Sequence, residues 1–237
     1  NNFMENNNTK QQISTPVAII VAGVLIMIGI LATKGVSNTD PKSKTLSEQV
    51  GVSKEKLLAC VKETDLESLN TNINDGVEEA MGHMPREERG TPYSIVIGKD
   101  GVKTEIRGAD SYANVKTIVD EALLGKVTTP YLGNVTPPVN DEHILGNPDA
   151  AVTIIEYSDY ECPYCKQFDA TLKQIVKESD GNVRWIYRHY PLHQHSFEKL
   201  VAAECITKLK GNDAFWKYSD LLFGLLKTGN ESVSEQL

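Results

Sequence analysis

The stretch that decides the fold is residues 151–165, AVTIIEYSDYECPYC, where a mostly apolar run leads to two cysteines three positions apart. Residues 151–157 (AVTIIEY) are rich in β-branched and aromatic side chains, which predicts a buried strand. Residues 163–178 predict a helix with proline in its first turn, a favourable position for that residue. Cys162 and Cys165 are therefore expected where a buried strand passes into a helix.

This position suits a redox-active pair of thiols. The free backbone N–H groups at a helix start stabilise negative charge, and the reactive form of cysteine is the thiolate. In Cys-x-x-Cys motifs the thiol pKa can fall to roughly 3.5–7.5. Pro163 and Tyr164 form the spacer, which brings the second sulfur within reach of the first. We expect Cys162 to be the exposed attacking thiol and Cys165 the buried resolving thiol.

Two other interpretations of the cysteine pair remain. The cysteines could be inert packed side chains, or they could form half of a zinc site completed by His189, His193 and His195. Zinc sites usually have other spacings, and a Pro-Tyr spacer at a strand-to-helix turn fits redox chemistry better. We therefore expect no metal and no cofactor.

Strand and helix patterns alternate through much of the chain, which indicates an α/β domain. Strands are predicted at residues 93–97, 102–106 and 182–189, and helices at residues 46–84, 111–124, 196–210 and 213–227.

The N-terminal part contains an apolar run. Residues 17–32 (VAIIVAGVLIMIGILA) carry no charge, and residues 14–33 would span roughly 30 Å as a helix. A cleaved signal peptide and a buried core helix are alternatives, but no convincing cleavage site follows and the run has no polar face. We predict a disordered polar tail (1–13), a transmembrane anchor (14–33) and a linker (34–45).

The composition limits the function. The 237-residue chain has a net charge of −8, which argues against a general affinity for nucleic acid. Its four cysteines are too few for a disulfide scaffold of this length, although they allow two bridges.

Residues 143–168 (HILGNPDAAVTIIEYSDYECPYCKQF) resemble the opening of DsbA-like thioredoxin-fold oxidoreductases. Residues 184–206 and 215–223 resemble that family's next strand and its helical insertion. The resemblance makes Glu156 the acidic group beneath the active site that assists proton movement at the resolving thiol. From the residues alone, a carboxyl group in an apolar strand would have a raised pKa and could accept a proton. The alternative is a surface glutamate.

The two segments that resemble this family occur in the reverse of the family's usual order. Residues 89–97 (RGTPYSIVI) resemble the family's cis-proline loop and the strand that follows it, which normally come after the cysteine motif. The family's C-terminal half (46–125) thus precedes its N-terminal half (143–237), with a linker at 126–142. A circular permutation, a truncated tandem and an artefact of the recorded order all remain open. We expect one thioredoxin fold with a helical insertion.

In that fold, Pro92 would pack against the cysteine pair, and the backbone of Thr91 would pair with an extended client peptide. The other two cysteines, Cys60 and Cys205, would both lie in the helical insertion. A structural disulfide between them is then expected, although both could simply be buried small apolar side chains.

The expected function is a membrane-anchored protein-disulfide oxidoreductase, most simply a dithiol oxidase. Its expected partners are unfolded or reduced client proteins, the lipid bilayer through residues 14–33, and, by resemblance, a membrane redox partner that reoxidises it. A dithiol oxidase has little use in a reducing cytosol, so the domain is expected on the extracytoplasmic side, in a periplasm or at a cell surface. The alternatives are a reductase or isomerase with the same site, a non-enzymatic tethered module with a structural or metal-binding cysteine pair, and a product whose two halves never meet.

Overall fold

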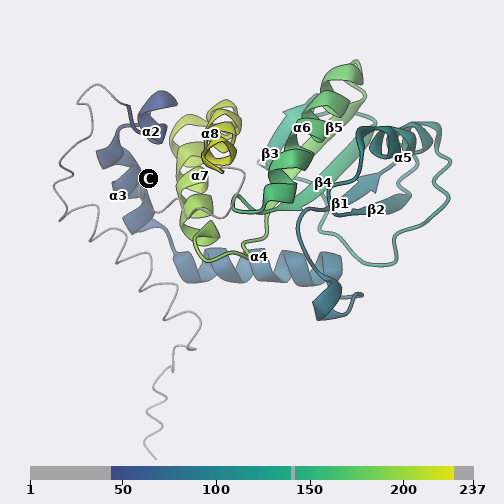
Figure 1. Ribbon diagram of the computed structural model, residues 1–237, viewed down its shortest axis with the longest axis horizontal. Coiled ribbons are helices and arrows are strands. Elements are labelled where there is room, and N and C mark those ends of the chain that lie inside the picture. Colours follow the sequence, from purple (N-terminus) through teal and green to yellow (C-terminus); the bar gives the residue numbers. More distant parts are fainter. Residues whose placement is uncertain (1–43, 140–141, 227–237) are drawn as a thin grey trace, which may run out of the picture. The chain divides into compact units, whose positions relative to one another are not determined.

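The computed structural model describes residues 44–139 and 142–226 (Figure 1). These residues form, in chain order, α2 (Leu46–Gln49), α3 (Lys54–Glu63), α4 (Leu66–Met81), a 3-10 turn η1 (Arg86–Glu88), β1 (Tyr93–Ile97), β2 (Lys103–Arg107), α5 (Tyr112–Leu124), β3 (His143–Gly146), β4 (Val152–Ser158), α6 (Pro163–Glu178), β5 (Val183–His189), α7 (Ser196–Lys210) and α8 (Asn212–Leu225).

The predicted tail (1–13), the predicted anchor (14–33) and most of the first linker (34–45) lie outside the described residues. The anchor therefore stays a prediction. Within the ranges that the structure describes, no helix combines the length and the apolar character needed to cross a bilayer.

The strands form one five-stranded sheet in the order β2-β1-β4-β5-β3. β4 lies in the centre, parallel to β5 and antiparallel to β1. β1 and β2, which match two of the predicted strands, form an antiparallel hairpin, and β3 adds an antiparallel edge strand beside β5. The first segment of the chain thus supplies β1 and β2, the second supplies β3, β4 and β5, and the two segments share a single sheet.

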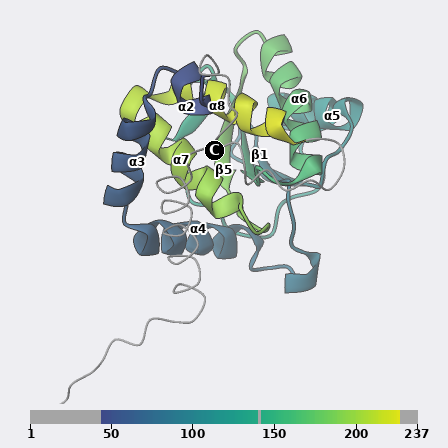
Figure 2. The ribbon, with the colours of Figure 1, turned by 60° about the vertical axis from the view of Figure 1, so that its left-hand side comes forward.

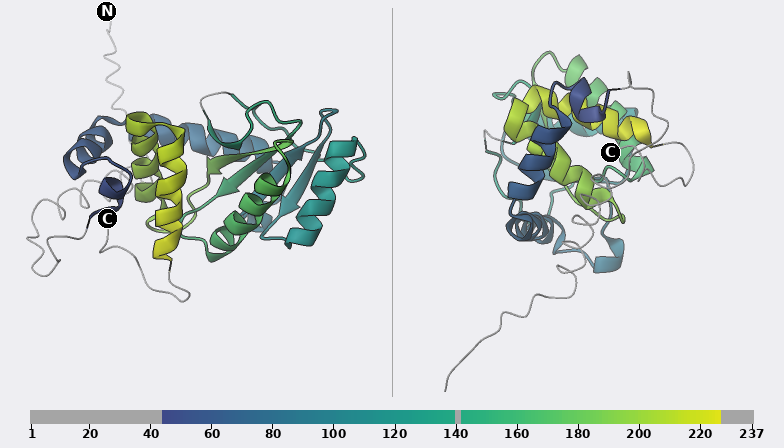
Figure 3. Two further views of the ribbon diagram at one scale, coloured as in Figure 1. Left: turned by 90° about the horizontal axis from the view of Figure 1, so that it is seen from above. Right: turned by 90° about the vertical axis from the view of Figure 1, so that its left-hand side faces the viewer.

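Helices cover both faces of this sheet (Figure 3). α4 packs on one face, where Val77, Ala80 and Met81 contact apolar side chains of β1, β4 and β5. α5 and α6 pack on the other face. Because β4 is central and covered on both sides, every residue in it is buried, which explains its nearly continuous apolar sequence.

A helical group lies at one end of the sheet (Figure 2) and also combines both segments. α7 packs against α8, and α3 packs against α7. A disulfide joins Cys60 of α3 to Cys205 of α7, with the Cα atoms 5.8 Å apart. This is the pair for which the sequence predicted a bridge.

The helical region predicted at 46–84 is divided into three helices, because polar side chains start new ones. Ser53 accepts a hydrogen bond from the Lys56 N–H and begins α3. Asp65 does the same for the Ser68 N–H and begins α4. The chain therefore turns twice before it reaches the sheet.

The other elements follow the prediction closely, with one omission. α6 has the predicted bounds. α5 ends at Gly125, which takes the left-handed conformation (φ 68°) that glycine adopts without steric cost. Strand β3 is not predicted from the sequence, because four residues are too few to show a strand periodicity and their pairing partner, β5, lies about forty positions away.

Candidate active site at the start of helix α6

The two free cysteines lie at the N-terminus of α6. Cys162 occupies the N-cap position and Cys165 the first turn. Cys165 is fully buried and Cys162 is 4% exposed. The expectation of an exposed attacking thiol is therefore wrong, because the loop before β1 lies against Cys162 and buries it. The Cys162 Sγ is 3.4 Å from the carbonyl oxygen of Thr91 and donates a hydrogen bond to it.

The sheet brings this loop to the cysteines. β1 pairs with β4 so that Tyr93 lies opposite Tyr157, near the end of β4 that leads into the cysteine motif. The residues just before β1 therefore lie beside the start of α6. They include Thr91 and Pro92, which are joined by a cis peptide bond. Two sequence segments predicted to form one site thus meet in the structure.

The two thiols have very different acidities. Hydrogen bonds from the Cys165 thiol, from Thr91 and from the backbone N–H groups of Tyr164 and Cys165 lower the pKa of Cys162 to about 6, against the opposing effect of burial. Burial raises the pKa of Cys165 far above its usual value, and the hydrogen bond that it donates to Cys162 raises it further. Cys162 is therefore the nucleophile and a better leaving group than Cys165.

Glu156 lies beneath the pair in the middle of β4. It is 0% exposed, and among the described residues neither carboxyl oxygen has a partner with good hydrogen-bond geometry. Burial raises its pKa to about 8. The alternative of a surface glutamate is therefore wrong, and near neutral pH the group can hold a proton close to Cys165.

Both spacer residues, Pro163 and Tyr164, are exposed. Pro163 opens α6, where its missing N–H leaves no unsatisfied donor. Tyr164 is 64% exposed, and Leu192 in the loop before α7 is 48% exposed. Both offer apolar surface to solvent.

Asp159, three residues before Cys162, is a site residue that was not predicted from the sequence. Its buried carboxylate accepts hydrogen bonds from the backbone N–H groups of Glu161 (2.7 Å), Leu192 (2.7 Å) and His193 (3.1 Å). It also accepts hydrogen bonds from the His193 ring (Nδ1, 2.8 Å) and from the Ser196 hydroxyl. Burial opposes ionisation, but these hydrogen bonds hold the pKa of Asp159 below its usual value.

A second acidic residue of the same turn, Glu161, also forms hydrogen bonds to the start of α7. Glu161 accepts hydrogen bonds from the buried Lys199 ammonium group (2.7 Å) and from the His195 backbone N–H (2.8 Å). Glu161 and Asp159 therefore attach the turn before the cysteines to the start of α7. In the sequence, the only sign of this role is that two acidic residues lie within three positions before Cys162.

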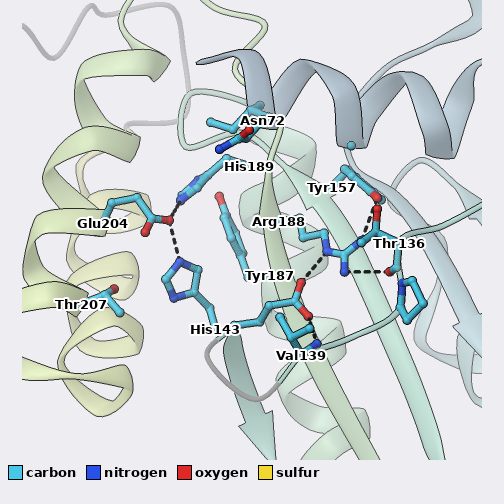
Figure 4. Close-up of a pocket in the computed structure, with 14 residues that line it drawn as sticks. Asn72, Thr136, Val139, His143, Tyr157, Tyr187, Arg188, His189, Glu204 and Thr207 are labelled. Carbon is cyan, nitrogen blue, oxygen red and sulfur yellow. Dashed lines mark hydrogen bonds and ion pairs between the residues drawn. The ribbon is translucent and has the colours of Figure 1, made fainter. Parts of the chain in front are cut away.

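A separate pocket of about 380 Å³ lies between α4, α7 and the β3 edge of the sheet (Figure 4). The Nε2 atoms of His143 and His189 lie 2.7 Å and 2.9 Å from one carboxyl oxygen of Glu204. Burial alone would raise the pKa of Glu204, but these hydrogen bonds hold it well below its usual value. Burial lowers the pKa of His189. The separations are those of hydrogen bonds, so this cluster ties β3, β5 and α7 together.

The histidines considered as zinc ligands have other partners. His189 is bonded to Glu204, and His193 to Asp159. Within the described ranges, the group of metal-ligand side chains whose donor atoms converge is His143, His189 and Glu204, and it does not include the cysteines. In the part of the chain that the structure describes, His189, His193 and His195 therefore do not group with Cys162 and Cys165 as metal ligands.

Comparison with known proteins agrees with this architecture. The thioredoxin family model matches residues 139–236. These residues include the cysteine motif and the strands and helices on both sides of it. The domain accordingly has a mixed α/β, thioredoxin-like fold.

Curated relatives match only part of the chain. The Na(+)/H(+) antiporter NhaA 1 of Salinispora arenicola is 37% identical over 81 residues, which are 34% of this chain and 12% of that protein. The antiporter NhaA of Herminiimonas arsenicoxydans is 33% identical over 89 residues, 37% of this chain and 14% of that protein. The chain thus spans about an eighth of the length of these relatives.

A solved structure, that of Pseudomonas aeruginosa DsbA2, is 35% identical in sequence. The match covers 38% of this chain and 50% of that chain, with a TM-score of 0.34.

Proposed function

We propose that this protein is a thiol–disulfide oxidoreductase that forms disulfides in client proteins by exchange through Cys162. The observation that carries the proposal is the position of the Cys162 thiol, at the N-terminus of α6 and 3.4 Å from the Thr91 carbonyl oxygen. Its lowered pKa and the raised pKa of Cys165 supply the asymmetry that disulfide exchange requires.

The reaction begins from the oxidised pair. A client thiolate attacks the Cys162 Sγ, the bond to Cys165 breaks, and a mixed disulfide forms. Cys165 leaves as a thiolate and takes a proton from Glu156. A second client thiolate then attacks the client sulfur, Cys162 leaves as a thiolate, and the client departs with a disulfide. The client is oxidised by two electrons and the protein is reduced by two.

The preferred direction follows from the stability of the reduced form. A thiolate at Cys162 stabilises the reduced protein, and this makes the oxidised protein an oxidant. A reductase or an isomerase would use the same residues, so the redox potential decides among the three.

The surface around Cys162 suits an extended and partly apolar peptide. The backbone of Thr91 lies beside the sulfur and can pair with a client strand. Tyr164 lies within the cysteine motif, and the Leu192 backbone N–H is bonded to Asp159 just before that motif, so both add exposed apolar area near the site. Unfolded or reduced proteins present both features, namely free backbone and apolar side chains.

The cellular setting of the proposal rests on two features. The Cys60–Cys205 disulfide fits an oxidising compartment, and the apolar run at residues 14–33 fits a single membrane anchor. We propose an extracytoplasmic domain, periplasmic or at the cell surface, that a membrane redox partner reoxidises.

We also infer that the two segments form one domain in permuted order. Residues 46–125 supply β1, β2 and α5, and residues 143–237 supply the cysteine motif. The shared sheet and the contact between Thr91 and Cys162 support this reading over two halves that never meet.

The test is to trap the mixed disulfide. A Cys165→Ala variant, activated as a mixed disulfide with glutathione and mixed with a reduced unfolded protein, should retain the client covalently at Cys162. A Cys162→Ala/Cys165→Ala variant is the matched control and should retain none. Failure of folded Cys165→Ala protein to retain any client would contradict the proposal. Zinc retained by the two thiols and removed only by a chelator would instead favour a metal-binding module.

Equilibration with glutathione buffers distinguishes an oxidase from a reductase. An oxidase should remain mostly reduced in a buffer that oxidises a reductase, because its Cys162 thiolate is stabilised.

A further inference from the structure

Three side chains beside the pocket of Figure 4 form a cluster that the proposed function does not use. His143 begins β3, His189 ends β5 and Glu204 lies in the middle of α7. Among the described residues, these three bring their potential metal-ligand atoms together, all within 4.8 Å of one another. The sequence analysis predicted no metal site here, since two of the residues are 61 positions apart and meet only through folding.

Both imidazole rings point the same nitrogen at one carboxyl oxygen (Figure 4). The Nε2 atoms of His143 and His189 lie 2.7 Å and 2.9 Å from the Oε1 atom of Glu204. Around a tetrahedral zinc ion, with bonds of about 2.0–2.1 Å, neighbouring donor atoms lie about 3.3 Å apart. The Glu204 carboxylate would therefore need to move by about half an ångström to admit the ion. Its side chain is 33% exposed and lines the pocket, which leaves room for that movement.

The fold holds both rings in place. His143 stacks on Phe215 of α8, with the ring centroids 3.5 Å apart and the ring planes 3° apart. The next residue, Ile144, is fixed by Asn212 of α8, which accepts a hydrogen bond from its N–H (3.1 Å) and donates one to its carbonyl oxygen (2.7 Å). His189 is 7% exposed and is paired within the sheet. Ligands that the scaffold already orders lose little freedom when an ion binds.

The donor atoms select the class of ion. Two imidazole nitrogens and one glutamate carboxylate are a known ligand set for zinc, in which a water molecule takes the fourth position. Calcium and magnesium instead prefer oxygen ligands alone. The pocket of about 380 Å³ beside the cluster offers space for the fourth ligand. The cluster therefore suits a divalent transition-metal ion.

We propose that His143, His189 and Glu204 form a binding site for a divalent transition-metal ion, with Zn²⁺ as the expected ion and its fourth position open to the pocket. The ion takes the place of the two hydrogen bonds to Glu204 and joins β3, β5 and α7 through coordination. It uses neither Cys162 nor Cys165. The site is thus separate from the proposed disulfide exchange.

The first test measures binding to the oxidised protein, in which the disulfide removes both active-site thiols as ligands. Metal-free protein is titrated with Zn²⁺ in competition with a chromophoric chelator. One ion per chain should bind at micromolar free Zn²⁺ or below. An excess of Ca²⁺ or Mg²⁺ should not displace it, because two of the three ligands are nitrogen atoms.

Glu204→Gln and His189→Gln each remove one ligand and keep a polar side chain of similar size. Each variant should weaken Zn²⁺ binding at least about 100-fold, because loss of a hydrogen-bond partner of a ligand alone costs about 10–100-fold. His83→Gln is the matched control. Its histidine lies beside Glu105, outside the cluster, so this variant should bind Zn²⁺ as the unaltered protein does.

Two further measurements do not depend on how well the variants fold. Zn²⁺ should raise the urea midpoint of the unaltered oxidised protein, and the midpoint should rise with Zn²⁺ concentration, because the ion binds the folded state. Co²⁺ bound to the reduced protein should show visible d–d bands without a thiolate charge-transfer band. A charge-transfer band that disappears in Cys162→Ala/Cys165→Ala would place the ion at the cysteines and overturn the inference.

Other results would also overturn the inference. These are an unaltered protein that takes up less than one Zn²⁺ per chain, an affinity that Glu204→Gln leaves unchanged, and displacement of Zn²⁺ by Ca²⁺. The metal-free protein should still form the mixed disulfide at Cys162. The metal site and the proposed function can therefore fail separately.

Discussion

The carbonyl oxygen of Thr91 lies 3.4 Å from the Cys162 sulfur, although the two residues are 71 positions apart. The contact joins the loop before β1 to the start of α6. It places the backbone that would receive a client strand beside the thiol that would attack it. Both halves of the candidate site are therefore needed, and they come from separate segments of the chain.

Thr91→Val should make Cys162 less acidic. The hydrogen bond from the Thr91 side chain helps to lower the pKa of Cys162 to about 6, and valine cannot donate one. We expect the pKa to rise by less than about one unit, since a hydrogen bond to a charged group contributes about 1.5 kcal/mol or somewhat more and water can replace part of it. The thiolate absorbance at different pH values measures this. Thr117→Ala, on the exposed side of α5, is the control and should leave the titration unchanged.

Glu156→Gln should stabilise the oxidised protein more at pH 8 than at pH 5. The folded-state pKa of Glu156 is about 8, above the 4.5 of an unperturbed glutamate. Its favourable contribution is complete below pH 4.5 and is lost as the pH rises towards 8, because the unfolded chain ionises and the folded protein does not.

The full loss is on the order of 4–5 kcal/mol, and an amide does not suffer it. Urea unfolding of the oxidised protein at several pH values measures the difference between variant and unaltered protein. A difference that stays constant with pH would mean that Glu156 ionises normally in the folded state.

Removal of the Cys60–Cys205 disulfide should destabilise the domain without removing its chemistry. The bridge joins residues 145 positions apart, and loops of this size are associated with a stabilisation of about 2–5 kcal/mol. A Cys60→Ala/Cys205→Ala variant should unfold at lower urea concentration and still form the mixed disulfide at Cys162. An unchanged unfolding midpoint would show that the bridge does not form in the protein.

Asp159→Asn should loosen the turn before the cysteines. Its carboxylate accepts five hydrogen bonds, and an amide must turn an N–H₂ group towards some of those donors. We expect a loss of about 2–4 kcal/mol at pH 7, within the range for breaking buried charged hydrogen bonds.

The pH dependence gives a sign for the Asp159 effect. The folded pKa of Asp159 is below the unfolded value, so its contribution is present above about pH 4 and is lost as the pH falls through the folded pKa. The difference in unfolding free energy between Asp159→Asn and the unaltered protein should therefore shrink in acid. Asp149→Asn, on an exposed turn, should change the unfolding free energy little at any pH.

Local patterns predicted most of the secondary structure. The apolar run before the cysteines became β4, and the proline-led helix became α6 with the predicted bounds. These elements depend on neighbours in the sequence, so their residues alone specify them. Strand β3 was not predicted, because it forms through its pairing with β5, which lies far along the chain.

The site was predictable in part. The spacing of Cys162 and Cys165 indicated their chemistry, and the resemblance indicated Thr91 and Pro92. The role of Asp159 was not visible, because an acidic residue in a sequence looks the same whether it faces water or a buried layer. Burial made the difference, since it removed solvent from the carboxyl group and left hydrogen bonds to decide its ionisation.

By itself, the sequence determined an α/β chain with a redox-type cysteine pair at a strand-to-helix turn. Only the tertiary structure decided that the two segments share one sheet, that Thr91 faces Cys162, and that the attacking thiol is largely covered. The reason is physical: helix starts and buried strands follow from local side chains, whereas the acidity of Cys162 depends on groups that folding brings from 71 positions away.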